Sequence, residues 1–152
     1  MEKMLRGYGI EVVVSTVGGA GILHQLVLVE AIKAVGTMKR FLPSKFGHDI
    51  DRANPVEPVT FYNKKQMVRR LIEALGIPYT YICCNSIAAW PYDDKHHPSD
   101  VLPPLDQIPI HGDGNIKAYF IDGEDIGKFT MKAIEDSRAI NKCVHFRTKT
   151  IV

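Results

Sequence analysis

A run of β-branched residues that ends at two glycines constrains the fold of this chain more than any other feature. Val12 to Val17 holds four valines and one threonine and is followed by Gly18-Gly19. Such a run predicts a strand that is buried on both faces, which is typical of a parallel sheet. The next segment has apolar residues at helical spacing and stops near Gly36, in the position of a C′ glycine. Strand, glycine turn and helix together predict the opening of an α/β fold.

The same alternation continues along the chain. Met38 to Pro43 predicts a second strand, residues 60–75 predict a helix that ends at Gly76, and Pro78 to Cys84 predicts a third strand. Repeated alternation of this kind predicts a doubly wound parallel sheet, of which only one βαβαβ half is visible. The remaining chain predicts a proline-containing loop at 85–107, short strands at 108–110 and 116–121, a helix at 124–135 and a last strand from Val144.

The pyrophosphate loop of a dinucleotide-binding fold follows the first strand of its first half. Gly19-Ala20-Gly21 could begin the G-x-G-x-x-G pattern, but His24 stands at the third glycine position. Arg40, rather than an acidic residue, lies about 20 residues further on, so we reject the pattern. With no preceding strand, Val12 to Val17 becomes an unpaired apolar edge, and such edges promote aggregation. We therefore expect a chain that is poorly soluble alone or that needs an oligomer or a partner chain.

Composition excludes several classes of protein. The formal net charge of +2 and the scattered basic residues argue against nucleic-acid binding. No apolar run reaches the roughly 18 residues of a membrane span, and the amino terminus lacks the apolar core of a signal peptide. Cys83, Cys84 and Cys143 make a poor disulfide framework and favour a reducing, cytoplasmic location. No zinc spacing occurs, and His96-His97 is interpreted as part of a solvated loop, so we expect no metal.

Two places carry side chains suited to proton transfer. Tyr62 and Lys65 are three residues apart in a predicted helix and so share a face, where a lysine can bind a nicotinamide ribose and move a proton. Burial or neighbouring cations would lower the pKa of that lysine toward its working range. His48 follows the second strand, at the edge where open α/β sheets bind ligands. Each place also has an alternative interpretation. Tyr62 and Lys65 could be two surface residues, and His48 could be a loop histidine bonded to Asp49.

Two segments of the chain resemble signatures of the leucoanthocyanidin reductase family. They are Arg40 to Asp49 (RFLPSKFGHD) and Ile82 to Ala88 (ICCNSIA), of which the Ile-Cys-Cys-Asn part is the more specific. This family of plant NADPH-dependent enzymes belongs to the isoflavone reductase-like, NmrA-type group of extended short-chain reductases. The similarity runs from about Glu2 to Arg147 and includes Trp90-Pro91-Tyr92, Gly112-Asp113-Gly114 and Asp125 to Thr130.

The resemblance implies a partial NmrA-like NAD(P)-binding domain over residues 1–152, truncated at both ends. Residues from 1 to about 84 would form the second half of a Rossmann-like sheet, and residues 85–152 would begin the substrate-binding lobe. The glycine-rich loop and the basic residues that select NADPH would lie before Met1, so cofactor binding should be weakened by the missing anion contacts. Lys45 stands where the family pattern has an acidic residue.

The resemblance also implies the roles of individual residues, with NADPH as cofactor and a small flavonoid as substrate. Lys65 matches a catalytic lysine and His48 a catalytic histidine, and Tyr62 would line the catalytic site. The residues matched to cofactor binding are Ser15, Val17, Gly18, Ser44, Phe46 and Arg69, and those matched to substrate binding are Asn85 and Ser86.

The reaction of the family removes the 4-hydroxyl of a flavan-3,4-diol and places a hydride there, which gives a catechin-type flavan-3-ol. Two other functions remain open. One is a non-catalytic binding or regulatory relative that pairs with a complete reductase, because a fold alone does not determine a function. The other is a reductase of another phenylpropanoid, such as an isoflavone or a lignan, and the segment from Ile82 to Asn85 argues against it.

Overall fold

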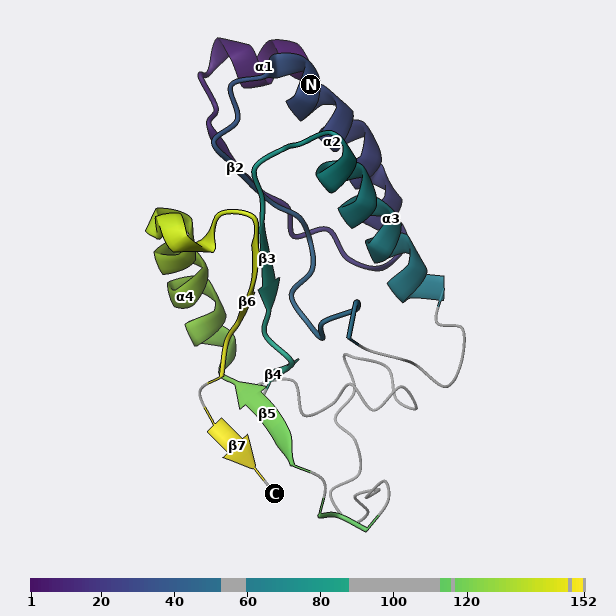
Figure 1. The fold of residues 1–152 in the computed structure, drawn as a ribbon, viewed down its shortest axis with the longest axis vertical. Coiled ribbons are helices and arrows are strands. Elements are labelled where there is room, and N and C mark those ends of the chain that lie inside the picture. Colours follow the sequence, from purple (N-terminus) through teal and green to yellow (C-terminus); the bar gives the residue numbers. More distant parts are fainter. Residues whose placement is uncertain (53–59, 88–112, 116, 148, 152) are drawn as a thin grey trace.

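The structure is a computed structural model that describes residues 1–52, 60–87, 113–115, 117–147 and 149–151. Its central feature is a parallel sheet (Figure 1). Two strand pairs build it, and a parallel bridge between Phe41 and Tyr79 joins them, which gives the order β1-β2-β3-β6. The predicted parallel α/β architecture is therefore confirmed. The strands of this sheet are β1 (Val12–Val14), β2 (Arg40–Leu42), β3 (Thr80–Cys83) and β6 (Lys142–His145).

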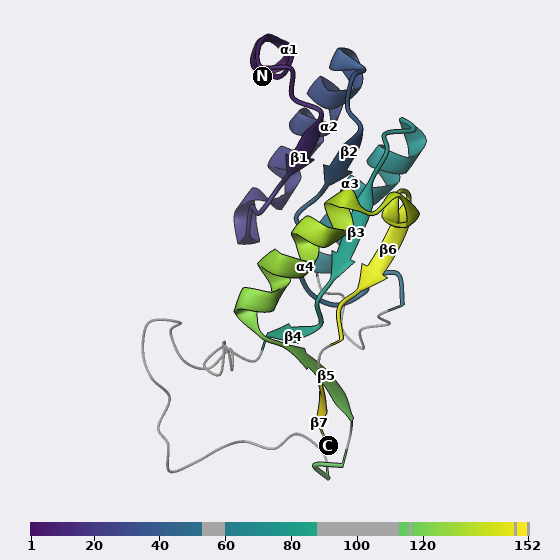
Figure 2. The ribbon, with the colours of Figure 1, turned by 90° about the vertical axis from the view of Figure 1, so that its left-hand side faces the viewer.

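Helices cover both faces of this sheet. Figure 2 shows α4 (Gly123–Glu135) in front of the strands and both α2 (His24–Val35) and α3 (Thr60–Ala74) behind them. The short helices are α1 (Glu2–Gly7) and the 3₁₀ turns η1 (Gly19–Leu23) and η2 (Ser137–Ala139). Within the described residues, no helix combines the length and apolarity that crossing a bilayer requires.

Local signals set the ends of two helices. Gly36 adopts a left-handed conformation with φ of 73°, and its N–H bonds the Ile32 carbonyl, so it ends α2 as predicted. Asp122 precedes α4 and accepts a hydrogen bond of 2.8 Å from the Glu124 N–H. A carboxylate in this position satisfies an otherwise unpaired amide and favours helix initiation.

Two apolar clusters form, one on each side of the sheet. On the side of α2 and α3, Phe41 is fully buried, whereas its neighbour Leu42 is fully buried on the side of α4. Successive residues of a strand point to opposite faces, so β2 contributes to both clusters. The first cluster also includes Val29, Ile32, Val68, Ile72 and Tyr81, and the second includes Ile82, Cys84, Ile121, Ala133 and Phe146.

A second, smaller sheet lies beyond the third strand, with the order β4-β5-β7. Its strands are β4 (Ser86–Ile87), β5 (Ala118–Ile121) and β7 (Lys149–Ile151). β5 confirms the strand predicted at 116–121, but the prediction of a loop from residue 85 was wrong for β4, because a two-residue strand shows no periodicity. The strand predicted at 108–110 lies outside the described residues. The division at residue 84 stays a prediction, although β6 returns to pair with β3.

β1 is less covered than predicted. Among the described residues it pairs only with β2, and its middle residue, Val13, packs against the cluster beside α2. Val12 and Val14 point to the opposite face and are 37% and 40% exposed. The prediction of a strand buried on both faces was therefore wrong for the described chain, because α4 covers β3 and leaves this end of the sheet open.

Because this apolar edge is open, we expect the 152-residue chain to self-associate. Replacing both Val12→Lys and Val14→Lys should raise the monomer fraction in sedimentation velocity, since charge on an edge strand opposes pairing. Val27→Lys is the matched control, because Val27 is 61% exposed but lies in a helix whose backbone is already bonded. A monodisperse wild-type monomer that melts cooperatively would contradict the expectation.

Candidate active site

The predicted site residues gather at the carboxyl edge of the parallel sheet. Ser44 follows β2, and its Oγ donates to the Val17 carbonyl beyond β1 at 2.5 Å. Ser15 continues the pairing of these strands, with its N–H 2.8 Å from the Leu42 carbonyl. Asn85 follows β3, and its N–H donates to the Gly47 carbonyl at 3.2 Å. Three segments that are far apart in sequence therefore meet at one edge, where α/β sheets bind their ligands.

A buried glutamine, which the sequence analysis did not identify, positions the loop after β2. Gln25 is 2% exposed in α2, and its Oε1 accepts a hydrogen bond of 2.7 Å from the Ser44 N–H. Its Nε2 donates to the Ile22 carbonyl at 3.1 Å. Both ends of the amide are thus bonded, which fixes Ser44 beside Val17. The only signal in the sequence was a polar residue on an otherwise apolar helix face.

Lys65 lies at the centre of this edge. Its ammonium donates to the Lys45 carbonyl at 3.0 Å, so α3 contacts the loop after β2. Burial lowers the pKa of Lys65 from its usual value of 10.5, and the nearby thiols of Cys84 and Cys83 oppose this change more weakly. The neutral amine is therefore more accessible near physiological pH than that of an exposed lysine. Tyr62 lies about one turn before Lys65 in α3 and is half-buried.

His48 is exposed in the same loop, so a ligand at this edge can reach its imidazole. Its neighbour Asp49 is bound from other directions. Lys45 lies 3.1 Å from one Asp49 oxygen, Arg69 lies 3.4 Å from that same oxygen, and His145 lies 3.5 Å from the other. In the alternative interpretation Asp49 bonds His48. The partners that these contacts give to Asp49 are instead Lys45, Arg69 and His145.

Arg69 and Lys45 point inward. Arg69 is 3% exposed, forms ion pairs with Asp49 and Asp51, and lies 4.2 Å from the centroid of the Tyr81 ring. Its Nε is buried and has no hydrogen-bond partner among the described residues. Lys45, at the position where an acidic residue was expected, is 2% exposed and pairs with Asp49. The cofactor contact assigned to Arg69 stays a prediction, and its guanidinium has protein partners in this structure.

The residues assigned to the substrate lie at the junction with the smaller sheet. Asn85 has a positive φ of 57°, and its Nδ2 donates to the Phe146 carbonyl at 3.3 Å. Ser86 begins β4 immediately after this turn. Phe46 is half-buried against the cluster beneath α4. The structure thus brings Asn85 and Ser86 close to the loop that carries both Phe46 and His48, while contacts of these residues with a ligand stay predictions.

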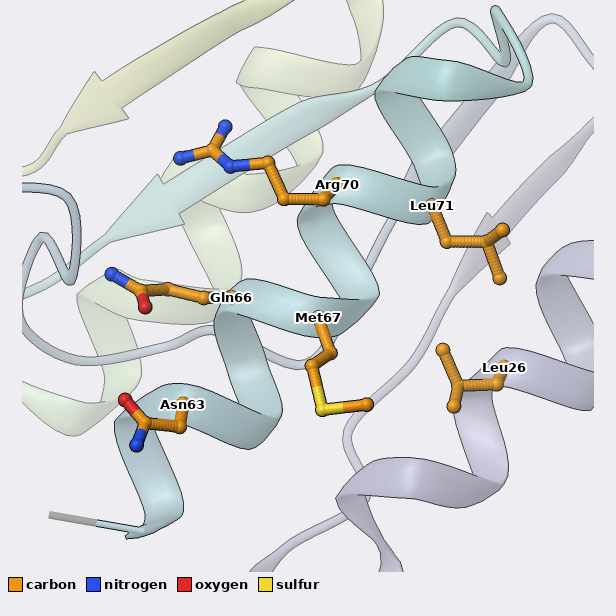
Figure 3. A pocket seen from close by; sticks show the side chains of 6 residues that line it. All are labelled: Leu26, Asn63, Gln66, Met67, Arg70 and Leu71. Carbon is orange, nitrogen blue, oxygen red and sulfur yellow. The ribbon is translucent and has the colours of Figure 1, made fainter.

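Two hollows of the described surface differ in size and in the residues that line them. A cavity of about 10 Å³ between Ser44, Lys65 and Arg69 is too small for a nicotinamide, so a ligand would lie on the exposed side of these residues. A larger open groove of about 690 Å³ lies between α2 and α3, and none of the predicted site residues lines it. Figure 3 shows its lining residues, which are Leu26, Asn63, Gln66, Met67, Arg70 and Leu71.

Known proteins resemble this chain over nearly its whole length. Leucoanthocyanidin reductase of Desmodium uncinatum is 66% identical over 148 residues, which is 97% of this chain and 39% of that protein. Phenylcoumaran benzylic ether reductase IRL1 of Ginkgo biloba is 49% identical over 139 residues, which is 91% of this chain and 45% of that protein. The chain therefore spans less than half the length of these two relatives.

A solved structure matches the fold equally well. The binary complex of leucoanthocyanidin reductase with NADPH from Vitis vinifera superposes with a TM-score of 0.86 at 61% identity, over 96% of this chain and 47% of that one. The family model described as the NmrA-like family matches residues 1–150. With the parallel sheet and the residues at its carboxyl edge, this match over nearly the whole sequence shows that the chain belongs to the NmrA-like family.

Proposed function

We propose that this chain forms the catalytic edge of an NADPH-dependent reductase that converts flavan-3,4-diols to catechin-type flavan-3-ols. The observation that carries the proposal is the half-buried amine of Lys65, which meets the loop of His48 where β1, β2 and β3 end. The similarity to leucoanthocyanidin reductases supports this substrate class, because identity falls from 66% to 49% for the relative named for a benzylic ether.

The exposed end of β1 fits the nicotinamide end of the cofactor. Val17 is 38% exposed, and a Cβ added to Gly18 would meet no protein atom within 4 Å, so a flat ring can approach this backbone. Ser44 adjoins this surface through its bond to the Val17 carbonyl. When bound, NADPH would supply a hydride to the substrate. The residues that would orient NADPH are Ser15, Val17, Gly18, Ser44 and Phe46. The buried Arg69 would support the loop that carries Ser44 and Phe46.

Lys65 and His48 are suited to opposite roles in proton transfer. The neutral amine of Lys65 would accept the proton of a phenolic hydroxyl on the A ring, since burial disfavours its charged form. The exposed imidazole of His48, when protonated, would donate to the 4-hydroxyl, which leaves as water. The resulting quinone methide would accept the hydride at C4, and Lys65 would return its proton to the phenolate. Substrate, hydride and one proton thereby give the flavan-3-ol and water.

Asn85 and Ser86 would contact the flavonoid, because they follow β3 and Asn85 bonds Gly47 of the His48 loop, whereas Val17 follows β1 and bonds Ser44. We also propose a cytoplasmic location, since the cysteines Cys83, Cys84 and Cys143 are free thiols.

Lys65→Met should lower kcat/KM for leucocyanidin with NADPH by about 10²- to 10⁴-fold, the range typical of a lost general base. The assay should compare leucocyanidin with an isoflavone and a lignan, in the 152-residue chain and in the longest natural polypeptide that contains it. Lys64→Met is the matched control, because Lys64 is the neighbouring lysine of the same helix and is also only partly exposed. Equal loss in both variants, or preferred turnover of the isoflavone or lignan, would contradict the proposal.

The same amine should set the pH dependence of the reaction. Because the neutral form is the base, kcat/KM should rise with pH through the pKa of Lys65, and this limb should lie below the ordinary lysine value of 10.5. Lys65→Arg keeps the charge but does not lose its proton in this range, so the rising limb should disappear. A rising limb at the same pH in Lys65→Arg would mean that a group other than Lys65 causes it.

Gly18→Val should weaken NADPH binding by at least about tenfold, because its side chain would fill the space proposed for the nicotinamide end. The space around Gly18 is open in the protein, so the melting temperature should change little. Gly7→Val provides the control, since its Cβ would also meet nothing within 4 Å and it lies in α1. Titration calorimetry measures the affinity of both variants for NADPH. An unchanged affinity in Gly18→Val would contradict the placement of the cofactor on this surface.

A further inference from the structure

Four side chains with metal-binding atoms meet beside the loop of His48. They are Asp49 from that loop, Cys83 from β3, and Cys143 and His145 from β6, and one ligand atom of each lies within 4.8 Å of the others. The register of the sheet explains the cluster. Tyr81 is opposite Cys143 and Cys83 is opposite His145, so these side chains share the face that α3 covers.

The distances within the cluster suit a tetrahedral ion. The Cys83 and Cys143 sulfurs are 2.9 Å apart, the Cys143 sulfur lies 3.8 Å from His145 Nε2, and His145 Nε2 lies 3.5 Å from Asp49 Oδ2. Zn–S bonds of about 2.3 Å and Zn–N or Zn–O bonds of about 2.0 Å require ligand separations of about 3.3–3.8 Å in a tetrahedron. Shifts of less than about 1 Å would therefore bring all four atoms into place.

The groups around the cluster orient its ligands as an outer shell does. Asp49 Oδ1 faces Lys45 at 3.1 Å and Arg69 at 3.4 Å, whereas Oδ2 lies 3.5 Å from His145 and 3.6 Å from the exposed Arg52. Arg69 Nη2 also lies 3.7 Å from the Cys143 sulfur. Hydrogen bonds of this kind fix the direction of metal ligands and raise affinity. Two thiolates and one carboxylate around a divalent ion leave one negative charge, which Lys45 compensates, while Arg69 also pairs with Asp51.

We propose that Asp49, Cys83, Cys143 and His145 bind a single Zn²⁺ ion. Two thiolates and an imidazole favour zinc over the hard ions magnesium and calcium, which prefer oxygen ligands. All four positions come from the protein, as in a structural site. His145 is 23% exposed and Cys143 is only partly buried, so an ion can enter from the surface. This site lies outside the proposed reductase chemistry, and its role is to fix the His48 loop against β6.

Co²⁺ titration of the reduced 152-residue chain tests the proposal. One equivalent should produce a thiolate-to-cobalt charge-transfer band and the intense visible bands of tetrahedral Co²⁺, and Zn²⁺ should displace it. Zn²⁺ should also raise the melting temperature, because it binds the folded state. Cys143→Ala and His145→Gln should each weaken Co²⁺ binding by more than about 100-fold, beyond the usual cost of losing an outer-shell partner.

Cys84→Ala is the matched control. Cys84 is as buried as Cys83 but lies in the cluster on the side of α4, so its loss should leave the cobalt spectrum unchanged. Circular dichroism establishes that each variant is folded. A wild-type chain without a charge-transfer band, a band that survives Cys143→Ala, or equal loss of the band in Cys84→Ala would overturn the assignment. None of these readouts depends on NADPH or turnover, so failure here is distinguishable from failure of the proposed reductase.

Discussion

The carboxylate of Asp49 holds together the residues at the carboxyl edge of the parallel sheet. It is 11% exposed and receives Lys45 from its own loop, Arg69 from α3 and His145 from β6. A buried carboxylate is costly unless several donors compensate it, so these elements must stay together once the chain folds. The loop that carries His48 is thereby held between a helix and a strand. This charge network adds to the apolar packing of Phe46 and of the buried Ile50, which lie in the same loop.

The helical period of α3 places two cationic side chains with different partners on one side of the helix. Residues four apart lie one turn from each other on the same side, so Lys65 and Arg69 both face the loop after β2. Arg69 meets the carboxylates of Asp49 and Asp51, whereas Lys65 donates to the uncharged Lys45 carbonyl. Burial has the largest influence on the pKa of Lys65 and lowers it, because the loss of hydration disfavours the charged amine. One helix face thus supplies a structural cation and the proposed proton acceptor.

Local signals predicted much of this fold, and pairing between distant segments accounts for what they missed. The valine run, Gly36 and the apolar spacing of α3 act within a few residues, so the strands and helices of the first half could be predicted. The meeting of Cys83 with Cys143 depends on the register of β3 against β6, which no spacing in the sequence records. For the same reason Lys45 was identified only as a departure from a family pattern. Its burial and its pairing with Asp49 depend on α3 and β6.

The proposed metal and the proposed reaction use the same anchor without sharing atoms. Zn²⁺ would take Asp49 Oδ2, whereas Lys45 binds Oδ1, so the Lys45 carbonyl that accepts from Lys65 would keep its place. An ion would then replace part of the attraction that now holds β6 to the loop. The effect on chemistry would pass through the position of His48, because His48 is joined to Asp49 by the chain itself. The proposed proton donation by His48 would depend on the loop that the metal would hold. The proposed proton acceptance by Lys65 rests mainly on its own burial, and Cys83, whose thiol has a smaller influence on the pKa of Lys65, is the residue through which the metal would act on it.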